Sequence, residues 1–134
     1  MKNLLIISAL FFALWSLTAE AQEQPRIPEG IFIAIRAGNA AELSKYLNST
    51  VELSLIKEED FYRKNVAETI LRDFFNEYKA KSFTIRHQGS RNDAQYAIGN
   101  LVTEKGNFRV YFLLKTVGRE QLIHQIRIEP DNER

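Results

Sequence analysis

The chain contains 134 residues, and its 18 lysine and arginine side chains nearly balance 17 aspartate and glutamate side chains, for a formal net charge of +1. This balance argues against nucleic acid or an anionic membrane surface as the main partner. The sequence contains no cysteine, which excludes disulfides, thiolate metal ligands and a lipid anchor on an N-terminal cysteine.

Residues 1–21 have the pattern of a secretory signal peptide. Lys2 precedes an uncharged apolar run from Leu4 to Leu17, and the small-x-small sequence Ala19-Glu20-Ala21 follows. We predict cleavage just before Gln22. The alternative is an uncleaved anchor, but the run is shorter than the roughly 20 residues that a membrane-spanning helix needs. After cleavage the chain would keep no stable membrane anchor and would work in the periplasm or outside the cell.

The remaining chain has the length of one domain, predicted over residues 28–130, with a flexible leader over 22–27 and a tail over 131–134. A short helix is predicted to begin at Pro28 and to end at Gly38. A second helix is predicted from Asn39, where Glu42 completes a capping box. The two helices would form a helical hairpin.

A strand with one buried face is predicted from the alternation in Val51–Leu55, with a short returning strand at 61–63. Asn65 and Glu68 form a second capping box, which predicts a longer helix that runs to about Lys79. Its apolar residues fall on one stripe: Ala67, Leu71, Phe74, Phe75 and Tyr78.

From Ser82 onward the hydrophobic period changes to two, which predicts strands at about 82–89, 94–104, 107–117 and 120–129. Lys105-Gly106 is predicted to form a tight hairpin turn, and Gly118 is predicted to lie in the next loop. Links this short make neighbouring strands antiparallel. The predicted fold is therefore α+β, with a helical hairpin and one long helix packed on a curved antiparallel sheet.

Four segments carry a resemblance to a known fold: the hairpin Ile31–Leu47 with its Ala37-Gly38-Asn39 corner, Val51–Leu55, Val66–Tyr78, and the meander from Tyr96 to Glu129. Their order resembles the nuclear-transport-factor-2-like (NTF2-like) superfamily, a cystatin-like α+β cone. Within it the chain resembles DUF4783, a bacterial family of secreted domains of unknown function. The superfamily includes isomerases, dehydratases, ligand-binding proteins and interaction modules, so the resemblance implies a fold and selects no activity.

The turn at Lys105-Gly106, taken as two residues long, predicts the strand register. Leu101 then pairs with Val110, Gly99 with Phe112 and Ala97 with Leu114. The loop at Gly118, taken as three residues long, pairs Leu114 with Leu122, Phe112 with His124 and Val110 with Ile126. This register gives one consistently apolar face.

The opposite face of the meander is mixed, and it is too apolar for a fully solvated surface: Tyr96, Ile98, Asn100, Val102, Arg109, Tyr111, Leu113, Lys115 and Arg127. In the superfamily such a face commonly forms a dimer, so Tyr96, Ile98, Tyr111 and Leu113 are the candidate homodimer residues. The alternative is a monomer with scattered exposed apolar side chains.

Both histidines fall in apolar registers, since His87 continues Phe83 and Ile85, and His124 lies between Leu122 and Ile126. One interpretation places them at the mouth of a cone-shaped pocket, with these ligand-binding candidates: His124, His87, Phe112, Phe74 and Tyr78. The other interpretation makes them partly buried histidines with hydrogen-bond partners in the fold, and makes the aromatic residues simply core.

We predict no catalytic residue, no metal site and no cofactor. A ketosteroid-type isomerase needs an inward carboxylate base, and in the chosen register no acidic residue of the meander points inward. The expected role is an exported, non-catalytic domain that binds a small apolar ligand or a protein partner. The alternative is a small isomerase-, lyase- or hydrolase-type enzyme that uses a pocket histidine and a tyrosine.

Overall fold

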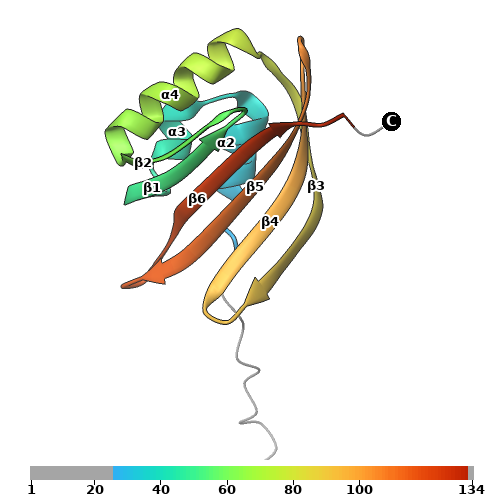
Figure 1. Ribbon diagram of the computed structural model, residues 1–134. Coiled ribbons are helices and arrows are strands. Elements are labelled where there is room, and N and C mark those ends of the chain that lie inside the picture. Colours follow the sequence, from blue (N-terminus) through green and yellow to red (C-terminus); the bar gives the residue numbers. More distant parts are fainter. Residues whose placement is uncertain (1–25, 133–134) are drawn as a thin grey trace, which may run out of the picture.

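The computed structural model describes residues 26–132, so the predicted signal peptide, most of the predicted leader and the last two residues lie outside the described residues. Within that range the chain is α+β, as predicted (Figure 1). The helices and strands run in this order: α2 (Glu29–Ala37), α3 (Ala40–Ser44), β1 (Leu47–Leu55), β2 (Glu58–Arg63), α4 (Lys64–Glu77), β3 (Ala80–Arg91), β4 (Ala94–Thr103), β5 (Gly106–Val117) and β6 (Glu120–Pro130).

Local chemistry explains the helical hairpin. Gly38 ends α2 in the left-handed conformation, with φ of 65°. Its N–H donates to the Ile35 carbonyl at 3.0 Å, and the Asn39 N–H donates to the Ala34 carbonyl at 2.8 Å, which satisfies carbonyls that a helix end leaves free. The Asn39 side chain accepts from the Glu42 N–H at 3.0 Å and thereby caps α3, as predicted.

The predicted cap of the long helix is wrong. α4 begins at Lys64, one residue before Asn65, and no side chain caps it. The cause lies in the sheet, because β2 pairs with β1 up to the Thr50–Arg63 pair and the helix follows that last paired residue directly. Asn65 instead lies in the first turn, where its carbonyl accepts from the Thr69 hydroxyl at 3.2 Å.

The six strands form one curved sheet in the order β2-β1-β6-β5-β4-β3. The meander β3 to β6 is antiparallel, as predicted, whereas β1 joins β6 in parallel and makes the sheet mixed. Such a parallel pairing needs a long crossover, and here α4 and the meander supply it. The three helices lie on one side of the sheet (Figure 1), which defines an inner, helix-covered face and an outer face.

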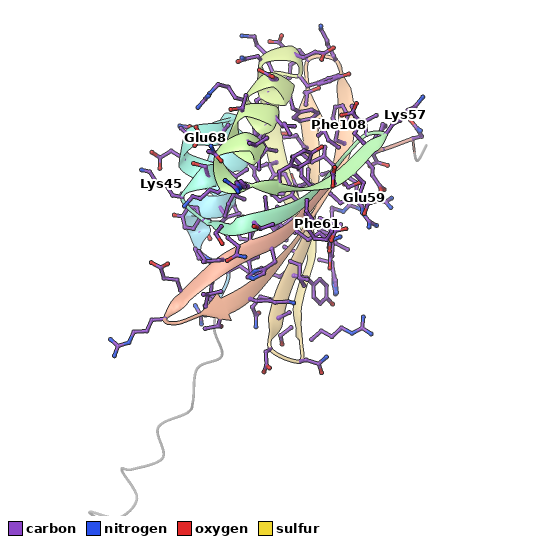
Figure 2. The ribbon with its side chains drawn as sticks, turned by 60° about the vertical axis from the view of Figure 1, so that its left-hand side comes forward. Lys45, Lys57, Glu59, Phe61, Glu68 and Phe108 are labelled. Atoms are coloured by element: carbon purple, nitrogen blue, oxygen red, sulfur yellow. The ribbon has the colours of Figure 1, made fainter. Side chains whose placement is uncertain are left out.

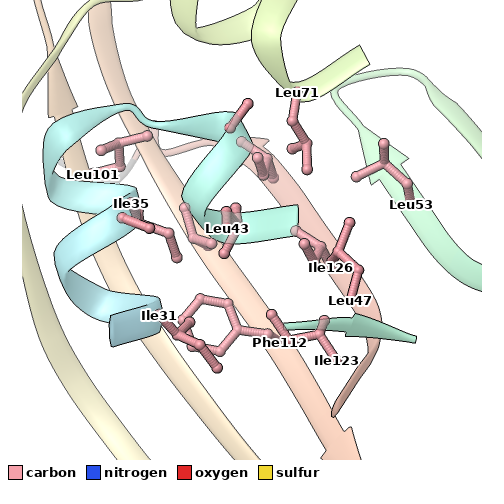
Figure 3. Close-up of a cluster of buried hydrophobic side chains, with 14 of the residues drawn as sticks. Ile31, Ile35, Leu43, Leu47, Leu53, Leu71, Leu101, Phe112, Ile123 and Ile126 are labelled. Atoms are coloured by element: carbon pink, nitrogen blue, oxygen red, sulfur yellow. The ribbon is translucent and has the colours of Figure 1, made fainter. Parts of the chain in front are cut away.

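Side chains from the helices and the inner face fill the space between the two layers (Figure 3). Ile31 and Ile35 of α2 and Leu43 of α3 are at most 2% exposed, as are Leu101 and Phe112 of the sheet. Burial of apolar side chains on this scale contributes most of the free energy of folding. The core therefore fills the inside of the cone, where one interpretation of the sequence places a ligand pocket.

The hairpin between β4 and β5 differs from the predicted register by two residues. Its turn residues are Glu104 and Lys105, because Thr103 pairs with Gly106. The Thr103 hydroxyl donates to the Gly106 carbonyl at 2.7 Å and accepts from the Lys105 N–H at 3.2 Å, which locks this turn. The observed pairs are Leu101–Phe108, Gly99–Val110 and Ala97–Phe112. A shift of two residues preserves the faces, so the predicted inner and outer sets of these strands stand.

Two β-bulges overturn the predicted placement of both histidines. Between β5 and β6 the register shifts after the Leu114–Ile123 pair, so that Leu113 faces Gln125 and His124 is the extra residue. Between β3 and β4 it shifts after the Ile85–Gly99 pair, so that His87 faces Ile98. Ile98 lies on the outer face, and His87 therefore lies there as well.

Candidate functional site

The outer face of β4 and β5 carries a patch of aromatic and aliphatic side chains. Tyr96 faces Leu113 and Ile98 faces Tyr111 across the two strands, and all four side chains are partly exposed. The predicted face thus exists as one surface, and we call these four residues the apolar patch. Side chains opposite one another in an antiparallel pair lie close enough to contact a partner together.

Two shallow grooves meet at the apolar patch. One, of about 390 Å³, is lined by the whole patch together with Arg91, Asn92 and Ala94. The other, of about 310 Å³, shares Ile98 and Tyr111 with the first and extends over β6: Arg109, Gln125, Arg127 and Glu129. Together they run from the β3–β4 turn to the last strand. Both are open to solvent, which suits a broad contact better than an enclosed ligand.

Charged groups flank the grooves on the β6 and β1 side. The Arg127 Nε lies 3.7 Å from a Glu129 carboxylate oxygen, and an Arg109 nitrogen lies 4.0 Å from an Asp131 carboxylate oxygen. A hydrogen bond to Glu59, together with burial and the nearby negative charge, raises the pKa of Glu52 above its ordinary value, although Arg127 opposes this shift.

The outer face continues to the first edge of the sheet. Phe61 of β2 faces Glu52 of β1, and its side chain is 67% exposed. Figure 2 labels Phe61 and Glu59 on this strand, away from the helix that carries Glu68. An exposed phenyl ring beside two carboxylates is unusual for a solvated edge and extends the contact surface beyond the apolar patch.

His87 belongs to this outer surface. Its Nε2 lies 3.0 Å from the Tyr96 hydroxyl, and the two rings are 5.5 Å apart between centroids. The pair lies at the rim of the apolar patch. His87 itself is exposed and Tyr96 is partly exposed, so the pair lies on an open surface and not in a closed pocket.

His124 neither faces Phe112 nor lies beneath α4, so its predicted place in the inner apolar register is wrong. The bulge directs Ile123 and Ile126 into the core, where they are at most 1% exposed, and leaves His124 partly exposed between them. Its Nδ1 lies 3.0 Å from the Leu122 carbonyl. Because that contact requires a proton on Nδ1, the neutral ring keeps Nε2 as an acceptor.

The remaining ligand-binding candidates are core residues in two separate clusters. Phe112 packs against Phe32 and Phe83, with centroids 6.0 and 6.2 Å away. Phe74 and Tyr78 pack on Phe108, with centroids 5.2 and 4.9 Å away. The structure therefore does not bring the five candidates His124, His87, Phe112, Phe74 and Tyr78 together.

Sequence reasoning missed the contribution of β1 and β2 to the outer face. Alternation in β1 indicated one exposed side, but Glu52 joins the surface only because β1 pairs with β6, where it faces Gln125. Across residues 26–132, no group of three or more histidine, aspartate or glutamate side chains is placed to hold a metal ion. No helix in the same range is long and apolar enough to cross a membrane.

Comparisons with known proteins agree with this architecture. A crystal structure of a DUF4783 family protein from Bacteroides ovatus is 40% identical in sequence, with a TM-score of 0.77, and the match covers 80% of this chain and 97% of that chain. A second, from Bacteroides uniformis, is 39% identical, with a TM-score of 0.77 and coverage of 81% and 100%. No curated protein matches the chain.

More distant likeness concerns the fold alone. The structure of Rd1NTF2_04 with long sheet is 15% identical, with a TM-score of 0.61, and the match covers 75% of this chain and 94% of that chain. It places the curved sheet and its helices in the NTF2-like class. The family description that matches residues 28–129 is domain of unknown function DUF4783, and this match spans nearly the whole described domain. The chain therefore belongs to the DUF4783 family.

Proposed function

We propose that this chain is an exported, non-catalytic binding module whose outer sheet face contacts another protein, and that a second copy of the chain is the occupant. The observation that carries the proposal is the apolar patch, in which two tyrosines, an isoleucine and a leucine share one accessible surface. A sheet face that contacts only water usually carries polar side chains. Contiguous exposed apolar surface is instead typical of contact sites.

The inner face of the sheet is less suited to binding a ligand than the outer face. Phe112 is fully buried, and its ring contacts Phe32 and Phe83 within the cone. A small apolar ligand would have to displace these rings, whereas a protein surface on the outer face displaces only water. A protein partner is therefore favoured over a ligand within the cone.

The charge distribution supports a second copy. Arg91 borders the apolar patch on the β3 side, while Glu52 lies on the β1 side, opposite Gln125 of β6. Between them, Arg127 and Glu129 of β6 lie close enough to offset each other's charge. A two-fold axis that runs through the patch along the strands would bring Arg91 of each copy toward Glu52 of the other. Such an isologous contact is self-complementary, as closed dimers require.

The substitution Tyr111→Glu tests this contact, because Tyr111 lines both grooves. Sedimentation at micromolar concentrations in high salt, which screens contacts between charged edges, should show dimers for the unmodified protein and monomers for the variant, since a buried unpaired carboxylate strongly opposes association. Val66→Glu is the matched control: Val66 is 44% exposed on α4, away from the outer face, and the variant should still dimerise. Unmodified protein that sediments as a monomer at high micromolar concentration would contradict the proposal.

Export is tested separately. The proposed cleavage site follows Ala19-Glu20-Ala21, so N-terminal sequencing of protein from the exported fraction should begin at Gln22. Replacing Ala19 and Ala21 with larger charged residues should leave the uncleaved precursor in the membrane fraction. Unmodified protein that keeps Met1 would contradict processing but would leave the contact through the outer face untouched.

A further inference from the structure

The two edge strands of the sheet carry opposite charge. Within residues 26–132, β2 and β3 each pair with a single neighbouring strand, so one long side of each has no strand partner. β2, with the sequence EEDFYR, has three carboxylates and one arginine. β3, with the sequence AKSFTIRHQGSR, has one lysine and two arginines, and it has no carboxylate. All these charged side chains are exposed.

An edge strand offers backbone N–H and C=O groups to any further strand, and charges on the edge decide which strand can approach. Like charges opposite each other destabilise a strand pair, whereas opposite charges stabilise it. Two copies of β2 therefore repel each other, as do two copies of β3. The favourable combination is β2 with β3, and each molecule carries one of each.

The acidic edge shows an excess of negative charge. Its Glu59 side chain crowds Glu52 closely enough for the two carboxyl groups to share a hydrogen bond, and the pKa of Glu52 rises as a result. Arginine or lysine from another molecule would relieve this crowding. Phe61 lies on the same strand and is 67% exposed, which provides an apolar anchor beside the charges.

We propose that β2 of one molecule pairs with β3 of the next, so that successive sheets join edge to edge. This contact is heterologous, and it produces a ring where the geometry closes and an open chain where it does not. It uses different residues from the apolar patch and goes beyond the face-to-face contact proposed above. The β3 segment from Arg86 to Arg91 suits it, because this end of the strand continues past the helices (Figure 1) and both arginines are exposed.

Charge reversal on either edge tests the proposal. One variant carries Glu58→Lys, Glu59→Lys and Asp60→Lys, and the other carries Lys81→Glu, Arg86→Glu and Arg91→Glu. Unmodified protein should form species larger than a dimer at about 10 mM salt and lose them near 1 M, as the Debye length falls from about 30 Å to about 3 Å. Each variant alone should lose these species, because both of its edges then carry the same sign.

An equimolar mixture of the two variants should restore the large species, since one supplies basic edges and the other acidic edges. The control carries Glu29→Lys, Asp73→Lys and Glu77→Lys on exposed helix positions, and it should assemble like the unmodified protein. Circular dichroism verifies that each variant is folded. A mixture of folded variants that stays unassembled, or a control that loses assembly as fully as the edge variants, would overturn the proposal.

A covalent test keeps the native edge charges largely in place. The chain has no cysteine, so Glu59→Cys combined with Arg86→Cys and a short bis-maleimide should give a ladder of covalent oligomers, whereas either cysteine alone should stop at a dimer. Adding Tyr111→Glu should leave the ladder intact, which separates this contact from the one through the apolar patch. A double-cysteine protein that yields only monomers and dimers at low salt would contradict edge-to-edge pairing.

Discussion

The two faces of the sheet use neighbouring residues of the same strands for different purposes. Phe112 points inward, is fully buried and contacts two other phenylalanine rings. Tyr111, one residue earlier, points outward and lines both grooves. The inner face is filled and stabilises the fold, while the outer face keeps apolar surface in contact with water. This contrast is the reason why the proposed contact lies on the outer face and not inside the cone.

The largest effect that separates the two faces is expected from truncating these neighbours. Phe112→Ala removes a ring that the helices and sheet enclose, and it should lower the free energy of unfolding by about 3–5 kcal/mol. Tyr111→Ala should cost about 1 kcal/mol or less when measured in dilute monomer. Urea unfolding of both variants measures the difference. Equal losses would show that the outer face is also part of the core.

Two glycines give a comparison of intermediate size. A Cβ at Gly99, on the inner face, would come within 2.6 Å of two Phe83 ring atoms and 2.9 Å of the Thr84 carbonyl oxygen. Gly99→Ala should therefore destabilise the domain by about 1–3 kcal/mol, because ring and backbone must both shift. At Gly89, on the outer face, a Cβ would meet the Tyr96 hydroxyl at 2.9 Å.

The Tyr96 side chain can swing outward into solvent, so Gly89→Ala should cost well under about 1 kcal/mol. It should instead disturb the contact between Tyr96 and His87, which a change in the NMR chemical shifts of the two rings would detect. Thermal unfolding of both alanine variants completes the comparison. A Gly89→Ala protein as unstable as Gly99→Ala would contradict the freedom assigned to the outer face.

The smallest effects are expected from two glutamates with opposite pKa shifts. The Ser44 hydroxyl and then Arg72, whose guanidinium nitrogen lies 2.5 Å away, lower the pKa of Glu68 below 4.5. The Ser44 hydroxyl has only one proton, and it donates this proton to the Ala41 carbonyl oxygen, 2.8 Å from its Oγ. Arg72 is therefore the more constant partner of the Glu68 carboxylate. Crowding by Glu59 raises the pKa of Glu52 above 4.5.

These directions give opposite signs of stability with pH. A lowered folded pKa contributes stability above pH 4.5 that is lost as the pH falls through the folded pKa, so Glu68→Gln should slightly destabilise the domain at pH 7 and have a smaller effect at pH 3. A raised folded pKa contributes stability at low pH that is lost as the pH rises, so Glu52→Gln should leave the domain equally or more stable at pH 7. Thermal unfolding at both pH values checks the signs. The Glu52 assignment fails if Glu52→Gln lowers the melting temperature at pH 7.

Prediction from sequence was most successful where a local pattern carries the information. Gly38 ends α2 and Asn39 caps α3 because a left-handed residue and a short side-chain acceptor act within a few residues. Alternation in β4 and β5 assigned Tyr96 and Tyr111 to the outer face even though the turn was misplaced by two residues, since an even shift leaves each side chain on its own face.

The prediction of register failed where one strand pairs with two neighbouring strands. β6 pairs with β5 in antiparallel and with β1 in parallel, and the Ile123 N–H donates to the Tyr46 carbonyl at 2.7 Å. Pairing with β1 places Ile123 beside Leu47 in the core. The register further along needs Ile126 to face inward as well, and only an extra residue, His124, reconciles the two.

The sequence by itself determined the α+β class, the order of its elements, the composition of the apolar core and the two-faced character of the meander, because these depend on local periodicity and short turns. Only the tertiary structure decided where the bulges fall, that β1 joins β6, that rings fill the cone, and that His87 lies outside it beside Tyr96. The physical reason is that a bulge satisfies hydrogen bonds and packing between strands that are distant in sequence. The hydrophobic pattern of one strand does not indicate which strands will pair with it.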